Sequence, residues 1–193
     1  MTAQAMRAIV GARLRAERRT LVFACASAAI VGYFATRSLA GPMFFCSTIG
    51  IAVALLQGPG RHAYLDTTER SAPLFGRELA RAKALAPVIS ATIATLVYWS
   101  AQLVSGFAAP AIFLALSLAC VLAATLVTLN ATTRNGAGRA LAVAFAGATV
   151  IVAFLLAKSG DAIGAATSLA FCVLVGFVAL RQYGESLARY EAL

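Results

Sequence analysis

Residues 110–129 read PAIFLALSLACVLAATLVTL, twenty consecutive positions without a charged side chain. A helix of about 20 predominantly apolar residues crosses the roughly 30 Å hydrocarbon core of a bilayer. This stretch therefore predicts a transmembrane helix, and the question becomes how much of the remaining chain follows the same pattern.

The composition of the whole chain agrees with a membrane protein. Of its 193 residues, 61% are hydrophobic and only 12% are charged, whereas soluble domains average about 45–50% and about 25%. These values exclude a disordered chain, a collagen-like chain and an ordinary cytosolic enzyme. The length accommodates roughly six spans of about 20 residues, which leaves no room for a separate water-soluble domain.

Five further stretches resemble 110–129 in length and apolar character. The six predicted spans are 20–36, 39–56, 85–105, 110–129, 140–157 and 162–180. We therefore expect one all-α, polytopic transmembrane domain over 1–193. Its parts are an interfacial helix at 1–19, paired spans at 20–56, 85–129 and 140–180, a long loop at 57–84, a polar loop at 130–139 and a tail at 181–193.

The cationic residues are distributed unevenly between the two sides of this arrangement. The chain has 16 Lys and Arg against seven Asp and Glu, a net charge of +9. All but Arg37 and Lys158 fall in the N-terminus, the 57–84 loop, the 130–139 loop or the tail. Because cytoplasmic segments are enriched in Lys and Arg, both termini are predicted to be cytoplasmic, most plausibly at a bacterial inner membrane. The positive charge then needs no nucleic acid partner to explain it.

The N-terminal segment 1–19 is too polar to span a membrane. Met6, Ile9, Val10 and Leu14 recur at helical spacing, most of the arginines fall elsewhere on the helix, and Arg13 lies near the boundary between the two faces. This pattern predicts an amphipathic helix on the membrane surface. A cleaved signal peptide is the competing interpretation, but its n-region would be unusually long and no convincing cleavage site follows.

The predicted spans carry no catalytic or ion-coupling chemistry. None contains Asp, Glu, Lys, Arg or His, and ion-coupled carriers usually need such residues inside the membrane. A single histidine, His62, cannot form an H-E-x-x-H metal site, and no P-loop motif is present. We therefore expect no enzymatic activity, no metal and no cofactor, so that any ATP hydrolysis belongs to a partner chain. Four cysteines lie in the spans as inert apolar residues: Cys25, Cys46, Cys120 and Cys172.

The long loop contains the segment 65–83, LDTTERSAPLFGRELARAK. Ser71 can cap a helix in which the early Pro73 is tolerated, and Phe75, Leu79 and Ala82 then share one face. The pattern predicts a short amphipathic helix at the cytoplasmic surface. Two interpretations of it stay open: a helix that fits a partner protein, and an interfacial loop that inserts apolar side chains among lipid headgroups.

This loop resembles that of the type-2 family of ATP-binding-cassette (ABC) exporter permeases. Members of that family have a short amphipathic N-terminal helix, six spans, cytoplasmic termini and a cytoplasmic coupling helix between spans two and three. The matching residues are Glu69, Arg70, Pro73, Leu74, Arg77, Glu78, Leu79 and Lys83. Larger members carry re-entrant helices between spans five and six. The short turn at 158–161 leaves no room for these helices, so the chain would be a minimal member.

The resemblance implies two kinds of partner protein. A separate cytoplasmic ATPase would receive the coupling helix in a groove, and a second permease subunit, identical or related, would complete the transporter. The residues implied in ATPase contact are Glu69, Arg70, Pro73, Leu74, Phe75, Arg77 and Glu78. Leu74 and Phe75 would be its apolar anchors, and the charged residues would form a rim that tunes specificity.

A polar stripe on the third predicted span is the remaining candidate site. Thr92, Thr95, Trp99 and Gln102 lie on one face of a helix. They would line a substrate pathway or join helices by hydrogen bonds, and the second interpretation is favoured because polar side chains commonly connect helices in lipid. The uncharged spans suit a hydrophobic or amphiphilic substrate. The alternative function is a non-transporting membrane scaffold or assembly subunit that binds a cytoplasmic partner or anionic membrane lipid.

Overall fold

The computed structural model describes residues 2–35, 38–57, 76–107, 110–133, 137–158 and 161–191. Within these ranges the regular structure is α-helical. The helices are α1 (Thr2–Ala16), α2 (Arg18–Phe34), α3 (Ala40–Gln57), α5 (Gly76–Val104), α6 (Ala111–Thr132), α7 (Ala137–Ala157) and α8 (Ala162–Glu191).

Five of these helices are long and apolar enough to cross a membrane. They are Ala40–Gln57, Arg81–Val104, Ala111–Thr132, Ala137–Ala157 and Ala162–Leu187. The chain is therefore an all-α integral membrane protein. The helix α2 covers the first predicted span but has 17 residues, which at 1.5 Å per residue makes it about 26 Å long. The sixth span thus stays a prediction.

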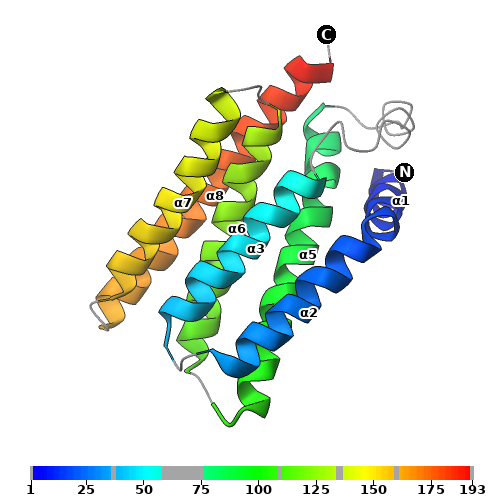
Figure 1. Ribbon diagram of the computed structural model, residues 1–193. Helices are drawn as coiled ribbons and strands as arrows, with labels where there is room; N and C mark the ends of the chain where they lie inside the picture. The colour runs from blue at the N-terminus through cyan, green and yellow to red at the C-terminus, as the bar shows by residue number, and fades with distance from the viewer. Residues whose placement is uncertain are drawn as a thin grey trace.

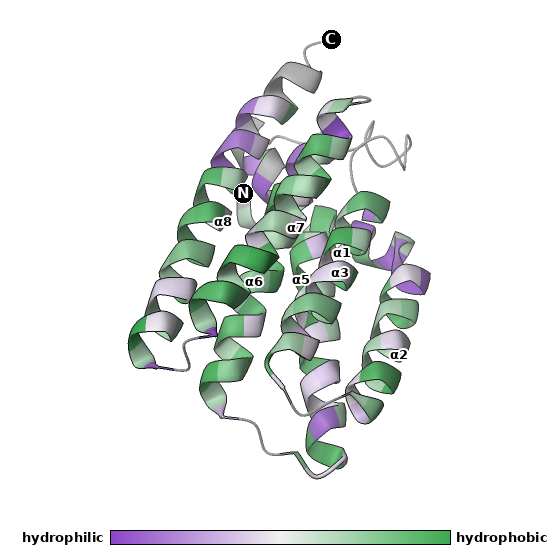
Figure 2. Ribbon diagram, turned by 60° about the vertical axis from the view of Figure 1, so that its left-hand side comes forward, coloured by the Kyte–Doolittle hydropathy of each residue, from purple (hydrophilic) through white to green (hydrophobic). Residues whose placement is uncertain are grey.

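The long helices lie side by side in one bundle (Figure 1). The helix α6 packs along both α7 and α8, α3 lies between α5 and α6, and α2 packs along α5. Hydrophobic residues cover the length of the bundle, and hydrophilic residues gather toward the end that holds α1 and the last turns of α8 (Figure 2).

Two helices begin or end well outside the predicted limits. The helix α5 runs without interruption from Gly76 to Val104 and contains Pro87. Residues 76–84, predicted to belong to a separate coupling helix, are therefore the first turns of the membrane-crossing helix. The predicted tail from residue 181 is likewise helical up to Glu191. The reason is that Tyr183 and Leu187 are fully buried against α3, α5 and α6 and hold these turns on the bundle.

The polar loop between α6 and α7 is shorter than predicted. Asn130 was expected at the start of this loop, but it lies in α6 and is buried. The turn between α7 and α8 is as short as the sequence indicates. There the Asp161 carboxylate accepts a hydrogen bond of 2.7 Å from the Gly164 backbone N–H, which caps the start of α8.

Helices α2 and α5 approach each other closely through small residues. Ala24, Ala28 and Gly32 recur at four-residue spacing on α2, and both alanines are buried. A Cβ atom on Gly32 would lie 2.5 Å from the Tyr98 backbone oxygen of α5. Only glycine therefore permits the present distance between the two helices, in the way that small residues allow close helix packing in membranes.

We predict that Gly32→Ala destabilises the folded protein in detergent by about 1–3 kcal/mol, the usual cost of overpacking. The measurement is the thermal unfolding midpoint followed by circular dichroism. The matched control is Gly147→Ala, since a Cβ at Gly147 meets nothing within 4 Å and alanine is the better helix former. Equal midpoints for the two variants would contradict the close packing of α2 on α5.

Candidate functional site

The predicted polar stripe on α5 faces the interior of the bundle. Thr95, Trp99 and Gln102 are buried, and Thr92 is half-buried. The Trp99 indole N–H donates to Ser117 Oγ of α6 at 2.8 Å. The Gln102 side-chain amide donates to the Gly32 carbonyl of α2 at 3.0 Å.

The two threonines of the stripe bond within their own helix. Thr92 Oγ1 donates to the Val88 carbonyl and Thr95 Oγ1 to the Ala91 carbonyl. None of the four stripe residues lines either of the two hollows described below. Their contacts fit the interpretation that the stripe joins α5 to its neighbours, and a role in a substrate pathway stays a prediction.

Most of the predicted ATPase-contact residues lie outside the described residues. These are Glu69, Arg70, Pro73, Leu74 and Phe75. Arg77 and Glu78 belong to the first turn of α5, where Glu78 is half-buried and the Arg77 side chain is not described. The contact surface therefore stays a prediction, whereas the helix that follows it is defined.

The first turns of α5 pack against the N-terminal helix. Leu79 and Ala82 of α5 form a buried cluster with Ile9 of α1, and Met6 packs against it. The sequence pattern of α1 predicted that these apolar residues face the membrane. In the structure they instead attach α1 to α5, because the helical turns at 76–84 offer an apolar partner that a loop would not.

A group of buried polar residues joins α1, α3 and α5 at the same end of the bundle. We call Arg13, Gln57 and Ser90 the corner cluster. All three side chains are buried. Arg13 Nη1 donates to the Gln57 carbonyl at 3.2 Å, and Gln57 Nε2 donates to Ser90 Oγ at 3.3 Å.

Glu17, one turn beyond Arg13, stabilises the junction between α1 and α2. Glu17 is the single residue between the two helices, and its carboxylate accepts a hydrogen bond of 2.8 Å from Thr20 Oγ1. The sequence does not reveal the cluster, because it places Gln57 in a loop. The one available signal was the position of Arg13 at the boundary of the apolar face of its helix.

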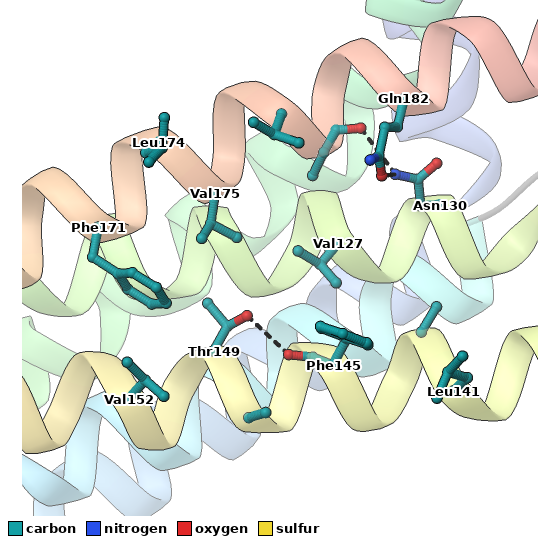
Figure 3. Close-up of a pocket in the computed structure, with 14 residues that line it drawn as sticks. Val127, Asn130, Leu141, Phe145, Thr149, Val152, Phe171, Leu174, Val175 and Gln182 are labelled. Atoms are coloured by element: carbon teal, nitrogen blue, oxygen red, sulfur yellow. Dashed lines mark hydrogen bonds between the residues drawn. The ribbon is translucent and has the colours of Figure 1, made fainter.

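A hollow of about 540 Å³ lies between α6, α7 and α8 (Figure 3). We call it the α6–α7–α8 groove. Its lining is mainly apolar, with Asn130 and Gln182 near one end (Figure 3). Asn130 Nδ2 donates to the Ala179 carbonyl at 3.1 Å and to Gln182 Oε1 at 3.3 Å. Sequence reasoning missed this groove because it placed Asn130 in a loop and Gln182 in a tail.

A second, shallower hollow of about 520 Å³ lies between α2 and α5. Its lining is almost entirely apolar and includes Ile30, Tyr33 and Val104. No three His, Cys, Asp or Glu side chains of the described ranges come together as metal ligands would. The described cysteines are free thiols.

Comparison of the chain with protein-family models, with curated proteins and with solved structures gives no match. The resemblance to ABC exporter permeases therefore stays a prediction that rests on the residues of the 57–84 loop and on the predicted spans.

The corner cluster predicts unequal roles for two neighbouring arginines of α1. Arg13→Met removes a buried charged donor, whereas Arg15→Met changes an exposed side chain that bonds within its own helix. We expect Arg13→Met to cost about 1.5–3 kcal/mol, the range for a hydrogen bond to a charged group, and Arg15→Met to have little effect. Hydrogen exchange of the α1 amides measures this difference, and equal protection in both variants would show that Arg13 does not hold α1 in place.

Proposed function

We propose that the chain is the transmembrane subunit of an ABC exporter, driven by a separate cytoplasmic ATPase and paired with a second permease subunit. It would itself hydrolyse no ATP. The proposal starts from the loop residues that resemble the type-2 permease family. The continuity of α5 supports the proposal further, because the first turns of α5 directly follow the segment that would contact the ATPase.

A continuous helix can transmit a movement from the ATPase into the membrane. The 29 residues of α5 extend about 44 Å at 1.5 Å per residue. The helix packs against α1, α2, α3, α6 and α8. A displacement at its first turn would therefore move several packed helices together, because close-packed interiors shift between arrangements rather than deform freely.

The orientation in this proposal is six spans with both termini in the cytoplasm of a bacterial cell. The helix α2 supplies the sixth span, with Phe23, Ile30 and Phe34 largely exposed on the outside of the bundle. Such exposure is costly in water and suits contact with lipid. The two arginines at the start of α2, Arg18 and Arg19, are exposed and would lie at the cytoplasmic interface.

The class of substrate follows from the walls of the bundle. No charged side chain occurs in α3, in α6 or between Ala84 and Val104 of α5, and none occurs in 140–157 of α7 or 162–180 of α8. A strongly ionic solute would find no counter-charge there. A hydrophobic or amphiphilic substrate is therefore proposed.

The proposed orientation predicts the outcome of reporter fusions. A periplasm-active phosphatase fused after residue 159 should be active, because that turn would lie outside the cytoplasm. The same reporter fused after residue 193, or inserted within the 57–84 loop, should be inactive. An active reporter in the 57–84 loop would place the coupling segment on the wrong side for an ATPase and would end the proposal.

Binding of an ATPase is the direct test of the proposed function. The chain should co-purify with a P-loop ATPase encoded in a neighbouring reading frame. Phe75→Ala should weaken this association by about tenfold or more, as expected for an apolar anchor. The charge reversal Glu69→Lys should also slow association, because rim charges steer the encounter of the two proteins. The control is Lys158→Glu, a charge change in the turn at the opposite end of α7.

The same experiment separates a transporter subunit from a scaffold. A permease subunit should also stimulate ATP hydrolysis by its partner in liposomes. Absence of any co-purifying ATPase, with no effect of either loop variant on cell function, would favour the non-transporting scaffold.

A further inference from the structure

The α6–α7–α8 groove opens on the lipid-facing side of the bundle. Its walls include Phe145 and Leu174, which are 63% and 63% exposed. Val127 of α6 lies between the two walls (Figure 3). In a bilayer a hollow at this position does not fill with water, so it must be occupied by a lipid chain or another apolar segment.

The length of the groove corresponds to one leaflet of the bilayer. Its lining runs from Leu141 to Val152 on α7 and from Phe171 to Gln182 on α8. Each stretch spans eleven residue steps, or about 17 Å of helix. This is about half of the roughly 30 Å hydrocarbon core, which is the depth reached by one acyl chain from its own side of the membrane.

The groove has a polar end that corresponds to the headgroup layer. Asn130 donates to Gln182 there, and the Gln182 amide group remains at the exposed rim. Asn130 Oδ1 is buried and has no hydrogen-bond partner among the described residues. The opposite end, near Val152 and Phe171, is apolar (Figure 3).

Two exposed arginines lie close in sequence to the lining residues of the polar end, although neither lines the groove itself. Helices α7 and α8 are antiparallel, and Ser168 Oγ donates to the Ala153 carbonyl between them. Arg139 lies fourteen residues before Ala153 on α7, and Gln182 lies fourteen residues after Ser168 on α8. Because the rise per residue is the same in both helices, Arg139 is expected at about the level of Gln182. Arg139 lies one turn before the lining residue Ala142, and Arg181 lies one turn beyond the lining residue Val178.

The charge at this end favours an anionic headgroup. Arg139 and Arg181 are exposed, and Glu185 is the one acidic side chain described nearby, paired with Arg181 at 3.4 Å across the exposed surface of α8. An exposed pair of this kind contributes little, so Arg181 can exchange Glu185 for a phosphate at small cost. The described side chains at the polar end thus leave a net positive charge.

We propose that the α6–α7–α8 groove binds an anionic phospholipid from the surrounding leaflet, with one acyl chain along α7 and α8 and its phosphate near Arg139, Arg181 and the Gln182 amide. The site is distinct from the loop that would contact an ATPase. It does not depend on the chain being a transporter.

A tryptophan placed in the groove tests the acyl-chain site. Ala148 and Ala144 are both exposed on α7, but only Ala148 lines the groove. Binding of phosphatidylglycerol to the purified chain is measured by native mass spectrometry. Ala148→Trp should weaken binding at least about tenfold, equivalent to about 1.4 kcal/mol, while Ala144→Trp should bind as the unmodified chain does.

The phosphate contact has its own test. The double variant Arg139→Gln with Arg181→Gln should lose the preference for phosphatidylglycerol over phosphatidylcholine of the same acyl chains. Arginines near a membrane surface attract anionic lipid, so the preference should fall at least about fivefold. The control is Lys158→Gln, which removes an exposed cation at the other end of α7 and should leave the preference intact.

Three results would overturn the proposal. The first is unchanged phosphatidylglycerol binding in Ala148→Trp, and the second is equal affinity of the unmodified chain for both lipids. The third is conversion of a dimer to a monomer by Ala148→Trp without loss of lipid, which would assign the groove to a second copy of the chain. None of these results depends on an ATPase, so failure here leaves the proposed transport function to its own tests.

Discussion

The bundle depends on close contact between helices in a medium that does not drive them together. Lipid chains are as apolar as leucine side chains, so association of membrane helices relies on close packing and on hydrogen bonds between them. Helices α2 and α5 show both at one place. Gly32 allows the backbone of α2 to reach Tyr98, and its carbonyl accepts a hydrogen bond from Gln102. The hydrogen bond from the Trp99 indole to Ser117 likewise joins α5 to α6.

Polar side chains at the end of the bundle that holds α1 have a different structural role. The corner cluster lies where α3 ends, and there Arg13 donates to the Gln57 carbonyl, one of the last carbonyls of α3 that have no partner within the helix. It also connects three helices that are distant in sequence. Because α1 packs on the first turns of α5, this end of the bundle would move with α5 in the proposed contact between an ATPase and the loop before Gly76.

The helical segments were largely predictable, and their ends were not. Continuous apolar runs such as 110–129 identify a helix from composition alone, since no other structure satisfies its backbone in lipid. The ends depend on contacts made elsewhere. Residues 181–191 look like a polar tail, yet Tyr183 and Leu187 find apolar partners on α3 and α6 and prolong α8. Residues 76–84 likewise look like a separate helix, yet they continue into α5.

The sequence by itself determined that this is a helical membrane protein, because hydropathy and the absence of charge within the spans are properties of the chain at each position. For the polar stripe of Thr92, Thr95, Trp99 and Gln102 it favoured helix contacts over a substrate pathway, since a polar side chain in lipid needs a partner. Only the tertiary structure decided which partners those are, and that Arg13 meets Gln57 or that Asn130 meets Gln182. The corner cluster and the α6–α7–α8 groove exist only where separate helices meet, and no local pattern encodes such a meeting.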